Sequence, residues 1–151
     1  DAQAGWDWLT QTKHEAPGRI VIVGRSLGSA IAAELASQQH PAGLMIEGAF
    51  TSLPNVGQER YPIFPVKLLS RFHYDTLAYL KRVTCPVLII HSRDDKVVKF
   101  HQAEELYAAV SGERTLVEIG GPHRGGYKPT RGIYLRGVQD FLTTKSTHGL
   151  S

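Results

Sequence analysis

Four short apolar runs rich in β-branched residues constrain the fold of this chain more than any other feature. The runs are Ile20–Val23, Leu44–Ile46, Val87–Ile90 and Leu116–Ile119, each bounded by glycine or proline. The first and third are continuously apolar, which is typical of strands buried on both faces of a parallel sheet. Segments with helical periodicity separate the runs, so the alternation predicts an α/β fold with a parallel sheet and flanking helices.

The expected helices follow the apolar runs, and one more precedes the first run. Apolar residues at helical spacing mark each of them. In chain order the marks are Ala4, Trp8 and Leu9; Ile31 and Leu35; Ala103, Leu106 and Val110; and Tyr134, Val138, Phe141 and Leu142.

Composition excludes several classes of protein. The chain has 151 residues, 42% hydrophobic and 21% charged, which is enough for one domain with its own core. The net charge of +3 comes without a basic stripe, so no nucleic-acid partner is expected. The single cysteine, Cys85, excludes an internal disulfide and favours a buried thiol. No membrane span or signal peptide is recognisable, and the cytoplasm is the default expectation.

A serine between two glycines follows the first apolar run. The segment Gly24–Gly28 reads Gly-Arg-Ser-Leu-Gly, the nucleophile-elbow pattern in its required strand–turn–helix context. We expect Ser26 to lie on a strained turn, with Gly24 and Gly28 at positions where a Cβ would clash. Its hydroxyl then projects above the carboxyl end of the strand. The N–H of Leu27, at the helix N-terminus, can donate to a developing oxyanion.

Acidic residues and a histidine follow two other strands. Asp94 and Asp95 come after the third apolar run, and His123 comes after the fourth. Functional groups collect at the carboxyl ends of the strands in this architecture. Because a serine nucleophile needs a histidine base oriented by a carboxylate, these residues predict a catalytic triad.

The segments that carry these residues resemble the α/β-hydrolases of the serine-aminopeptidase-like group, which includes protein depalmitoylases and many bacterial esterases. The matching segments read GRSLGSA, IEGAFTSL, CPVLIIHSRDDKVV and GGPH, and the likeness extends from Asp1 to Thr143. The chain order Ser, Asp, His is also the order of these hydrolases.

The resemblance implies a role for each site residue. Ser26 corresponds to the nucleophile, His123 to the general base and Leu27 to an oxyanion-hole amide. The acid falls on Asp95 rather than Asp94. His91, by contrast, is expected to be structural, as is Glu47 at the end of the second run.

Two departures from the family are visible. Ser92 stands where the family usually has glycine after the strand histidine. Moreover, only the last four of the family's eight strands are recognisable, which predicts a truncated domain over residues 1–143 and a polar tail over 144–151. The missing part normally supplies the second oxyanion N–H, often marked by a His-Gly motif, and residues 1–19 contain none. Losing one such donor costs about 10²–10³ in rate.

The missing strands also affect the first apolar run. In the family this strand is paired on both sides, and without a neighbour Ile20–Val23 becomes an exposed apolar edge that invites pairing. We therefore predict either that the chain self-associates through this edge, as a homodimer, or that it lacks an N-terminal segment of a longer protein.

A long aromatic connection, residues 51–75, follows the second run. Connections of this length are uncommon and often functional, so the segment is a possible short lid or cap; apolar packing over the sheet is the alternative. Its Tyr61, Phe64 and Phe72 are consistent with an apolar acyl pocket and equally with core packing.

The sequence thus predicts a serine hydrolase that cleaves carboxylic esters or related acyl compounds in a small-molecule substrate, with no metal or organic cofactor. The alternative is a catalytically weak or inactive α/β-hydrolase-like domain with a binding or scaffold role, because the N-terminal oxyanion loop is missing. A dinucleotide site is excluded, since Ser26 and Ser29 stand where that fingerprint requires glycine.

Overall fold

The structure is a computed structural model that describes residues 2–52, 74–125 and 127–148. Strands and helices alternate in the described residues, as the sequence predicts. The strands are β1 (Val21–Arg25), β2 (Gly43–Glu47), β3 (Val87–Ser92) and β4 (Arg114–Ile119). The helices are α1 (Ala2–Asp7), α2 (Leu27–Gln38), α5 (Thr76–Leu80), α6 (Phe100–Ala109) and α7 (Arg131–His148), with a π-helical turn η1 (Trp8–Thr12) and a 3-10 turn η2 (Pro17–Arg19) before β1.

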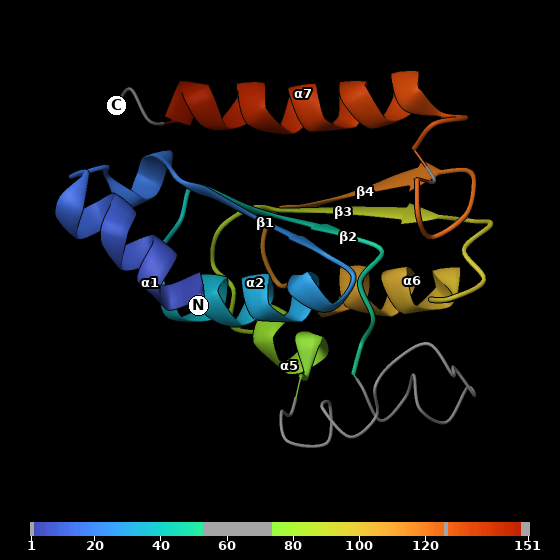
Figure 1. Ribbon diagram of the computed structural model, residues 1–151, viewed down its shortest axis with the longest axis horizontal. Coiled ribbons are helices and arrows are strands. Elements are labelled where there is room, and N and C mark those ends of the chain that lie inside the picture. Colours follow the sequence, from blue (N-terminus) through green and yellow to red (C-terminus); the bar gives the residue numbers. More distant parts are fainter. Residues whose placement is uncertain (1, 53–73, 126, 149–151) are drawn as a thin grey trace.

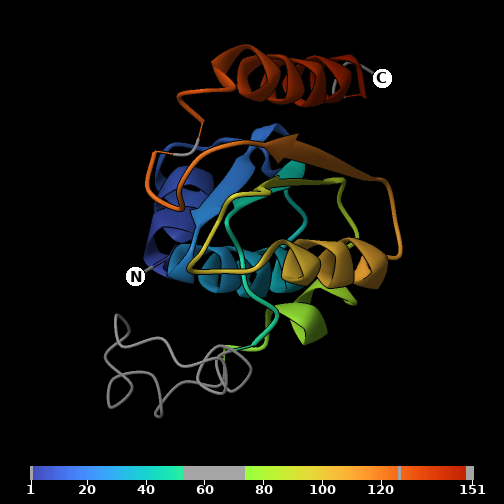
Figure 2. The same ribbon diagram turned by 90° about the vertical axis from the view of Figure 1, so that its right-hand side faces the viewer.

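The strands of the described residues form one parallel sheet in the order β1-β2-β3-β4. Helix α7 lies on one face of the sheet, and α2 and α6 lie on the other (Figure 1). Helix α5 packs against α2 and α6 on the side away from the sheet (Figure 2). All four predicted strands and the predicted parallel α/β fold are therefore confirmed.

Strand β3 is the buried centre of this arrangement. All six of its residues are buried, and its side chains alternate between the two faces. Val87 and Ile89 join the core under α2 and α6, whereas Leu88 and Ile90 join Phe141 of α7. Each such side chain stabilises the fold by about 1.5–3 kcal/mol through burial.

Strand β1 lies at the edge of the sheet. It pairs with β2 alone, and α7 packs over β3 and β4 instead. Ile22 packs on the core under α2, but Val23 is 60% exposed. Unlike β3, β1 is thus not buried on both faces, even though both sequences read as continuous apolar runs. The expected exposed apolar edge is present in this structure.

Two segments lie differently from a simple reading of the sequence. Helix α7 continues to His148, into the segment expected to be a polar tail, because no proline or glycine interrupts residues 138–148. Ser52 and Asp75, at the ends of the long connection, form an isolated antiparallel bridge. Most of the possible lid, with Tyr61, Phe64 and Phe72, lies outside the described residues.

Candidate active site

Ser26 occupies a strained turn between β1 and α2. Its backbone has φ of 50° and ψ of −121°, a conformation that non-glycine residues rarely adopt. Its N–H donates to the Glu47 carbonyl of β2 at 2.8 Å, which ties the turn to the neighbouring strand. Ser26 is half-buried and lines an open cleft. Such a hydroxyl is accessible to a substrate.

The two glycines of the elbow differ in what they allow. A Cβ on Gly24 would lie 2.5 Å from the Gly28 carbonyl oxygen and 2.6 Å from the Ala32 Cβ, so only glycine lets α2 pack this closely on β1. A Cβ on Gly28 would meet nothing within 4 Å. The expected clash is thus found at Gly24, and the expectation for Gly28 is wrong, because Gly28 faces open space at the start of α2.

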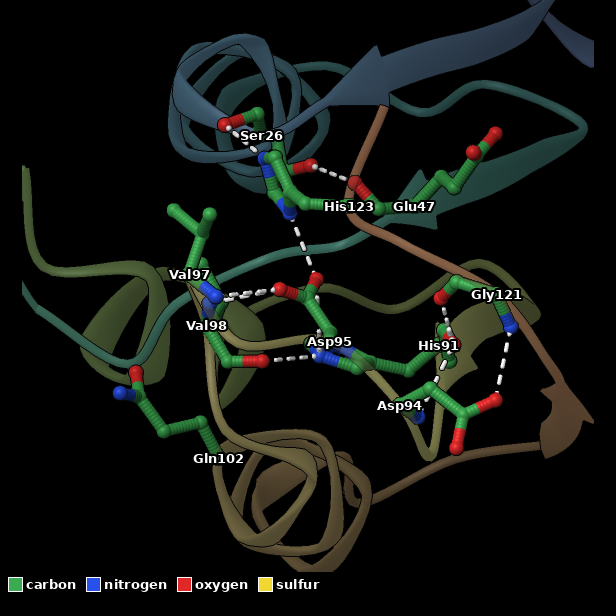
Figure 3. A network of polar contacts seen from close by, with 12 residues as sticks. Ser26, Glu47, His91, Asp94, Asp95, Val97, Val98, Gln102, Gly121 and His123 are labelled. Carbon is green, nitrogen blue, oxygen red and sulfur yellow. Dashed lines mark hydrogen bonds and ion pairs between the residues drawn. The ribbon is translucent and has the colours of Figure 1, made fainter. Parts of the chain in front are cut away.

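The structure brings Ser26, His123 and Asp95 together (Figure 3). His123 Nε2 lies 3.0 Å from Ser26 Oγ, and His123 Nδ1 lies 2.6 Å from Asp95 Oδ2. A carboxylate only accepts hydrogen bonds, so Nδ1 carries the proton and Nε2 is left free to accept from the serine hydroxyl. The imidazole therefore bridges a hydroxyl and a buried carboxylate that come from three different strand ends.

Asp95 is held as an anion in a buried position. Its Oδ1 accepts the N–H groups of Val97 and Val98 at 2.8 and 2.9 Å. Burial by itself raises the pKa of the Asp95 carboxyl, but the hydrogen bonds from His123 and from the two amides outweigh it, so the pKa lies below its ordinary value. Asp95 is thus ionised at neutral pH.

The neighbouring aspartate contacts a different group. Asp94 Oδ2 accepts the Gly121 N–H at 2.9 Å, while the Ser92 hydroxyl donates to the Gly121 carbonyl. Ser92, the departure from the family pattern, therefore joins the end of β3 to the loop that carries His123. The sequence analysis did not predict that Ser92 and Asp94 contact Gly121.

His91 lies behind the acid and is fully buried. Its Nε2 donates to the Val98 carbonyl at 2.9 Å and is 3.7 Å from Asp95 Oδ2. Burial lowers the pKa of His91 below its ordinary value, so the ring is neutral at pH 7. It therefore acts as a packed polar group that supports the Asp95–Val98 turn.

Two further residues at the site escaped sequence reasoning. Gly48 has φ of 55°, and a Cβ there would lie 3.1 Å from the His123 ring, so glycine after β2 makes room for the imidazole. Arg25 Nη2 donates to the His123 carbonyl at 3.0 Å. Two signals in the sequence could have identified these residues. Arg25 directly precedes Ser26, and Gly48 is a glycine at the end of a predicted strand, directly after Glu47.

Glu47 anchors Arg25 in this position. Glu47 Oε1 lies 3.3 Å from Arg25 Nε, and Oε2 accepts the Tyr134 hydroxyl at 3.3 Å. Burial, and then the Glu47 carboxylate, raise the pKa of Tyr134, which keeps its hydroxyl protonated. Glu47 is therefore a satisfied polar group beside the site, as the sequence predicts, and it connects β1, β2 and α7.

An open cleft of about 1040 Å³ lies over Ser26 and His123. Its other lining residues include Arg25, Asp94, Lys96, Val97 and Arg124. Leu27 is the first residue of α2, where backbone N–H groups have no partner within the helix, so its N–H is available beside Ser26.

The described residues contain neither a cluster of metal ligands nor a helix suited to a membrane. Within ranges 2–52, 74–125 and 127–148, no three His, Cys, Asp or Glu side chains gather in a way that could hold a metal ion. Of the helices described, none is both long and apolar enough to cross a membrane.

Comparison of the sequence with known proteins agrees with this geometry. A family model described as serine hydrolase matches residues 3–123. An uncharacterised protein of Mycobacterium tuberculosis strain H37Rv is 34% identical over 150 residues, 99% of this chain and 53% of that protein. The lysophosphatidylserine lipase ABHD12 of Rattus norvegicus is 26% identical over 133 residues, 76% of this chain and 33% of the lipase. The chain spans about half the length of the mycobacterial relative, and less of the lipase.

Comparison of the structure gives the same fold. An esterase of Pyrococcus furiosus superposes with a TM-score of 0.76 at 22% identity, covering 95% of this chain and 60% of the esterase. A puromycin-hydrolysing peptidase of M. tuberculosis gives a TM-score of 0.74 at 20% identity, covering 97% of this chain and 24% of the peptidase. These neighbours confirm the predicted fold class, an α/β fold with a parallel sheet and flanking helices.

Proposed function

Since the chain belongs to the serine hydrolase family, we propose that it cleaves carboxylic esters or related acyl compounds through an acyl-enzyme formed on Ser26. The observation that carries the proposal is the His123 imidazole, which lies 3.0 Å from the Ser26 hydroxyl and 2.6 Å from the Asp95 carboxylate. An esterase and a lipase among the similar proteins support an ester substrate, although the peptidase shows that the fold also serves other acyl compounds.

In the proposed reaction Ser26 Oγ attacks the acyl carbon while His123 Nε2 takes the hydroxyl proton. The oxyanion that forms accepts the N–H of Leu27, and its collapse expels the leaving group, which receives the proton from His123. Water then attacks the acyl-enzyme with His123 again as the base, which releases the acid and restores Ser26. Asp95 fixes the imidazole tautomer and stabilises the imidazolium throughout.

A binding or scaffold role is the second candidate function. It is favoured by the edge position of β1, because no strand among the described residues lies beyond β1 to bring a second oxyanion donor toward Ser26. Absence of that donor would lower the rate by about 10²–10³ without disturbing the fold.

A fluorophosphonate probe, which reacts with activated serines, separates the two functions. The hydrolase proposal expects labelling that Ser26→Ala abolishes and that Ser37→Ala, on the same helix, leaves unchanged. A screen of neutral 4-nitrophenyl esters of increasing acyl length then identifies the preferred substrate. Cooperatively unfolding protein that takes up no label and cleaves no ester would instead support the scaffold role.

The edge of β1 remains the predicted place of pairing. Its backbone groups on the side away from β2 have no strand partner among the described residues, and Val23 adds exposed apolar surface. Self-association predicts a concentration-dependent dimer in sedimentation that Val23→Lys dissociates. A stable monomer at all concentrations, with this edge unpaired, would contradict the prediction.

A further inference from the structure

Each of the three proposed catalytic residues has a cationic neighbour in the chain. Arg25 directly precedes Ser26, Lys96 directly follows Asp95, and Arg124 directly follows His123. All three cationic side chains line the cleft over the serine hydroxyl. Three strand ends therefore bring positive charge, as well as the triad, to the same cleft.

The three cations are not equally free. Arg25 is engaged by Glu47 and by the His123 carbonyl, so its charge is partly offset and its position is fixed. Lys96 and Arg124 are exposed, and neither forms an ion pair within the part of the chain that the structure describes. These two side chains can turn toward a molecule in the cleft.

Among the described residues that line the cleft, one side chain carries negative charge. Asp94 is the carboxylate among the described lining residues, and one of its oxygens already accepts the Gly121 N–H. Asp95 lies buried behind the imidazole, and hydrogen bonds from His123 and two amides stabilise its charge there. Positive charge therefore predominates where a substrate would lie.

We propose that the cleft selects esters that carry an anionic group, a carboxylate or a phosphate, a few bonds from the scissile carbonyl. Lys96 and Arg124 attract that group, and Arg25, held in place beside the serine, adds to the field. The inference rests on the proposed ester hydrolysis and names its substrate class. Because the two free cations are exposed, the attraction weakens as salt screens it.

A matched pair of substrates measures this selectivity. 4-Nitrophenyl hydrogen adipate and its methyl ester differ by one charge at the far end of the acyl chain. Their six-carbon chain disfavours attack of the free carboxylate on its own ester. Attraction between unit charges about 5 Å apart in water changes binding about fourfold, so two cations together favour the anionic ester by about 15-fold in kcat/KM. Raising the salt concentration toward 1 M should remove most of this preference.

Substitution of the two exposed cations in the cleft provides a second test of this selectivity. The double substitution K96Q/R124Q should reduce the preference to nearly one. The matched control K13Q/R19Q removes the same charge at the amino end of β1, the opposite end of the sheet (Figure 1), and should leave the preference unchanged.

The outcomes separate this inference from the function on which it rests. Ser26-dependent cleavage of both esters, with a preference that K96Q/R124Q abolishes and K13Q/R19Q does not, supports the inference. Ser26-dependent cleavage with equal kcat/KM for the two esters, or with a preference that K96Q/R124Q leaves intact, overturns it while the hydrolase proposal stands. Failure to cleave either ester, together with no fluorophosphonate labelling, overturns both.

Discussion

Strands β3 and β1 each end at a proposed catalytic group, but the two strands are held very differently. β3 pairs on both sides, is buried throughout and leads to Asp95, whose carboxylate accepts two backbone amides and the imidazole. β1 pairs with β2 alone, exposes Val23 and leads to Ser26, whose backbone is strained. Asp95, the proposed acid, is thus fixed by the interior of the sheet, whereas Ser26, the proposed nucleophile, depends on one neighbouring strand and on close packing of α2.

The first prediction concerns the acid side and has the largest expected effect. Asp95→Asn should lower kcat by about 10⁴, because an amide facing Nδ1 favours the wrong imidazole tautomer. Asp94→Asn, one residue away, should change kcat by less than about threefold, since the carboxylate of Asp94 accepts the Gly121 N–H and a neutral amide oxygen still accepts that bond. Steady-state kinetics on a neutral ester measures both. Equal losses in the two variants would show that the acid has been assigned to the wrong residue.

The second prediction concerns the nucleophile side. Gly24→Ala should lower the free energy of unfolding by about 3 kcal/mol, because its Cβ would push α2 away from β1. Gly28→Ala should be neutral or stabilise by up to about 1 kcal/mol, since alanine is the better helix former and meets open space. Urea denaturation of both variants checks the pair. If the two substitutions have similar effects, the packing contrast at the elbow is wrong.

The third prediction concerns Arg25, which links the end of β1 to the loop that carries His123. Arg25→Ala should lower kcat about tenfold with the fold intact, because the His123 carbonyl loses a hydrogen bond from a charged donor. Arg25 thus acts as a positioning residue, and Arg25→Lys should restore part of the rate. Arg93→Ala, which removes an exposed pair with Glu118, is the control and should leave kcat unchanged. Equal rates in wild type and Arg25→Ala would exclude this positioning role.

The fourth prediction uses the pKa of Asp95. A folded-state pKa below the ordinary value means that Asp95 stabilises the fold above about pH 4 and that this contribution disappears as the pH falls through the folded pKa. The stability difference between wild type and Asp95→Asn should therefore shrink as the pH falls below about 4. Urea denaturation at several pH values measures it. A difference that grows on acidification would have the wrong sign.

Much of the fold could be predicted from the sequence because the governing patterns are local. Continuous apolar runs bounded by glycine or proline identified the four strands, and the Gly-Arg-Ser-Leu-Gly segment identified the elbow. Burial could not be predicted in the same way. Val23 and Ile89 are both β-branched residues in apolar runs, yet one is 60% exposed and the other fully buried. The difference arises because helices cover the face on which Ile89 lies, whereas α7 packs over β3 and β4 rather than over β1.

The site shows the same limit. Ser26, Asp95 and His123 could be chosen from type and placement, and the structure lays them within hydrogen-bonding distance. The contacts that hold the His123 loop could not be predicted, since Arg25 and Ser92 reach it across 98 and 29 residues of sequence. Such contacts follow from which strand ends are adjacent.

The most direct test of the account is the rate at which a fluorophosphonate reacts with Ser26 when the imidazole is removed. His123→Gln should lower the second-order rate constant by at least about 10³, because the serine loses its base. His40→Gln, an exposed histidine after α2, is the matched control and should react at the wild-type rate. If His123→Gln reacts as fast as wild type, the imidazole does not activate the serine, and the proposed mechanism is contradicted.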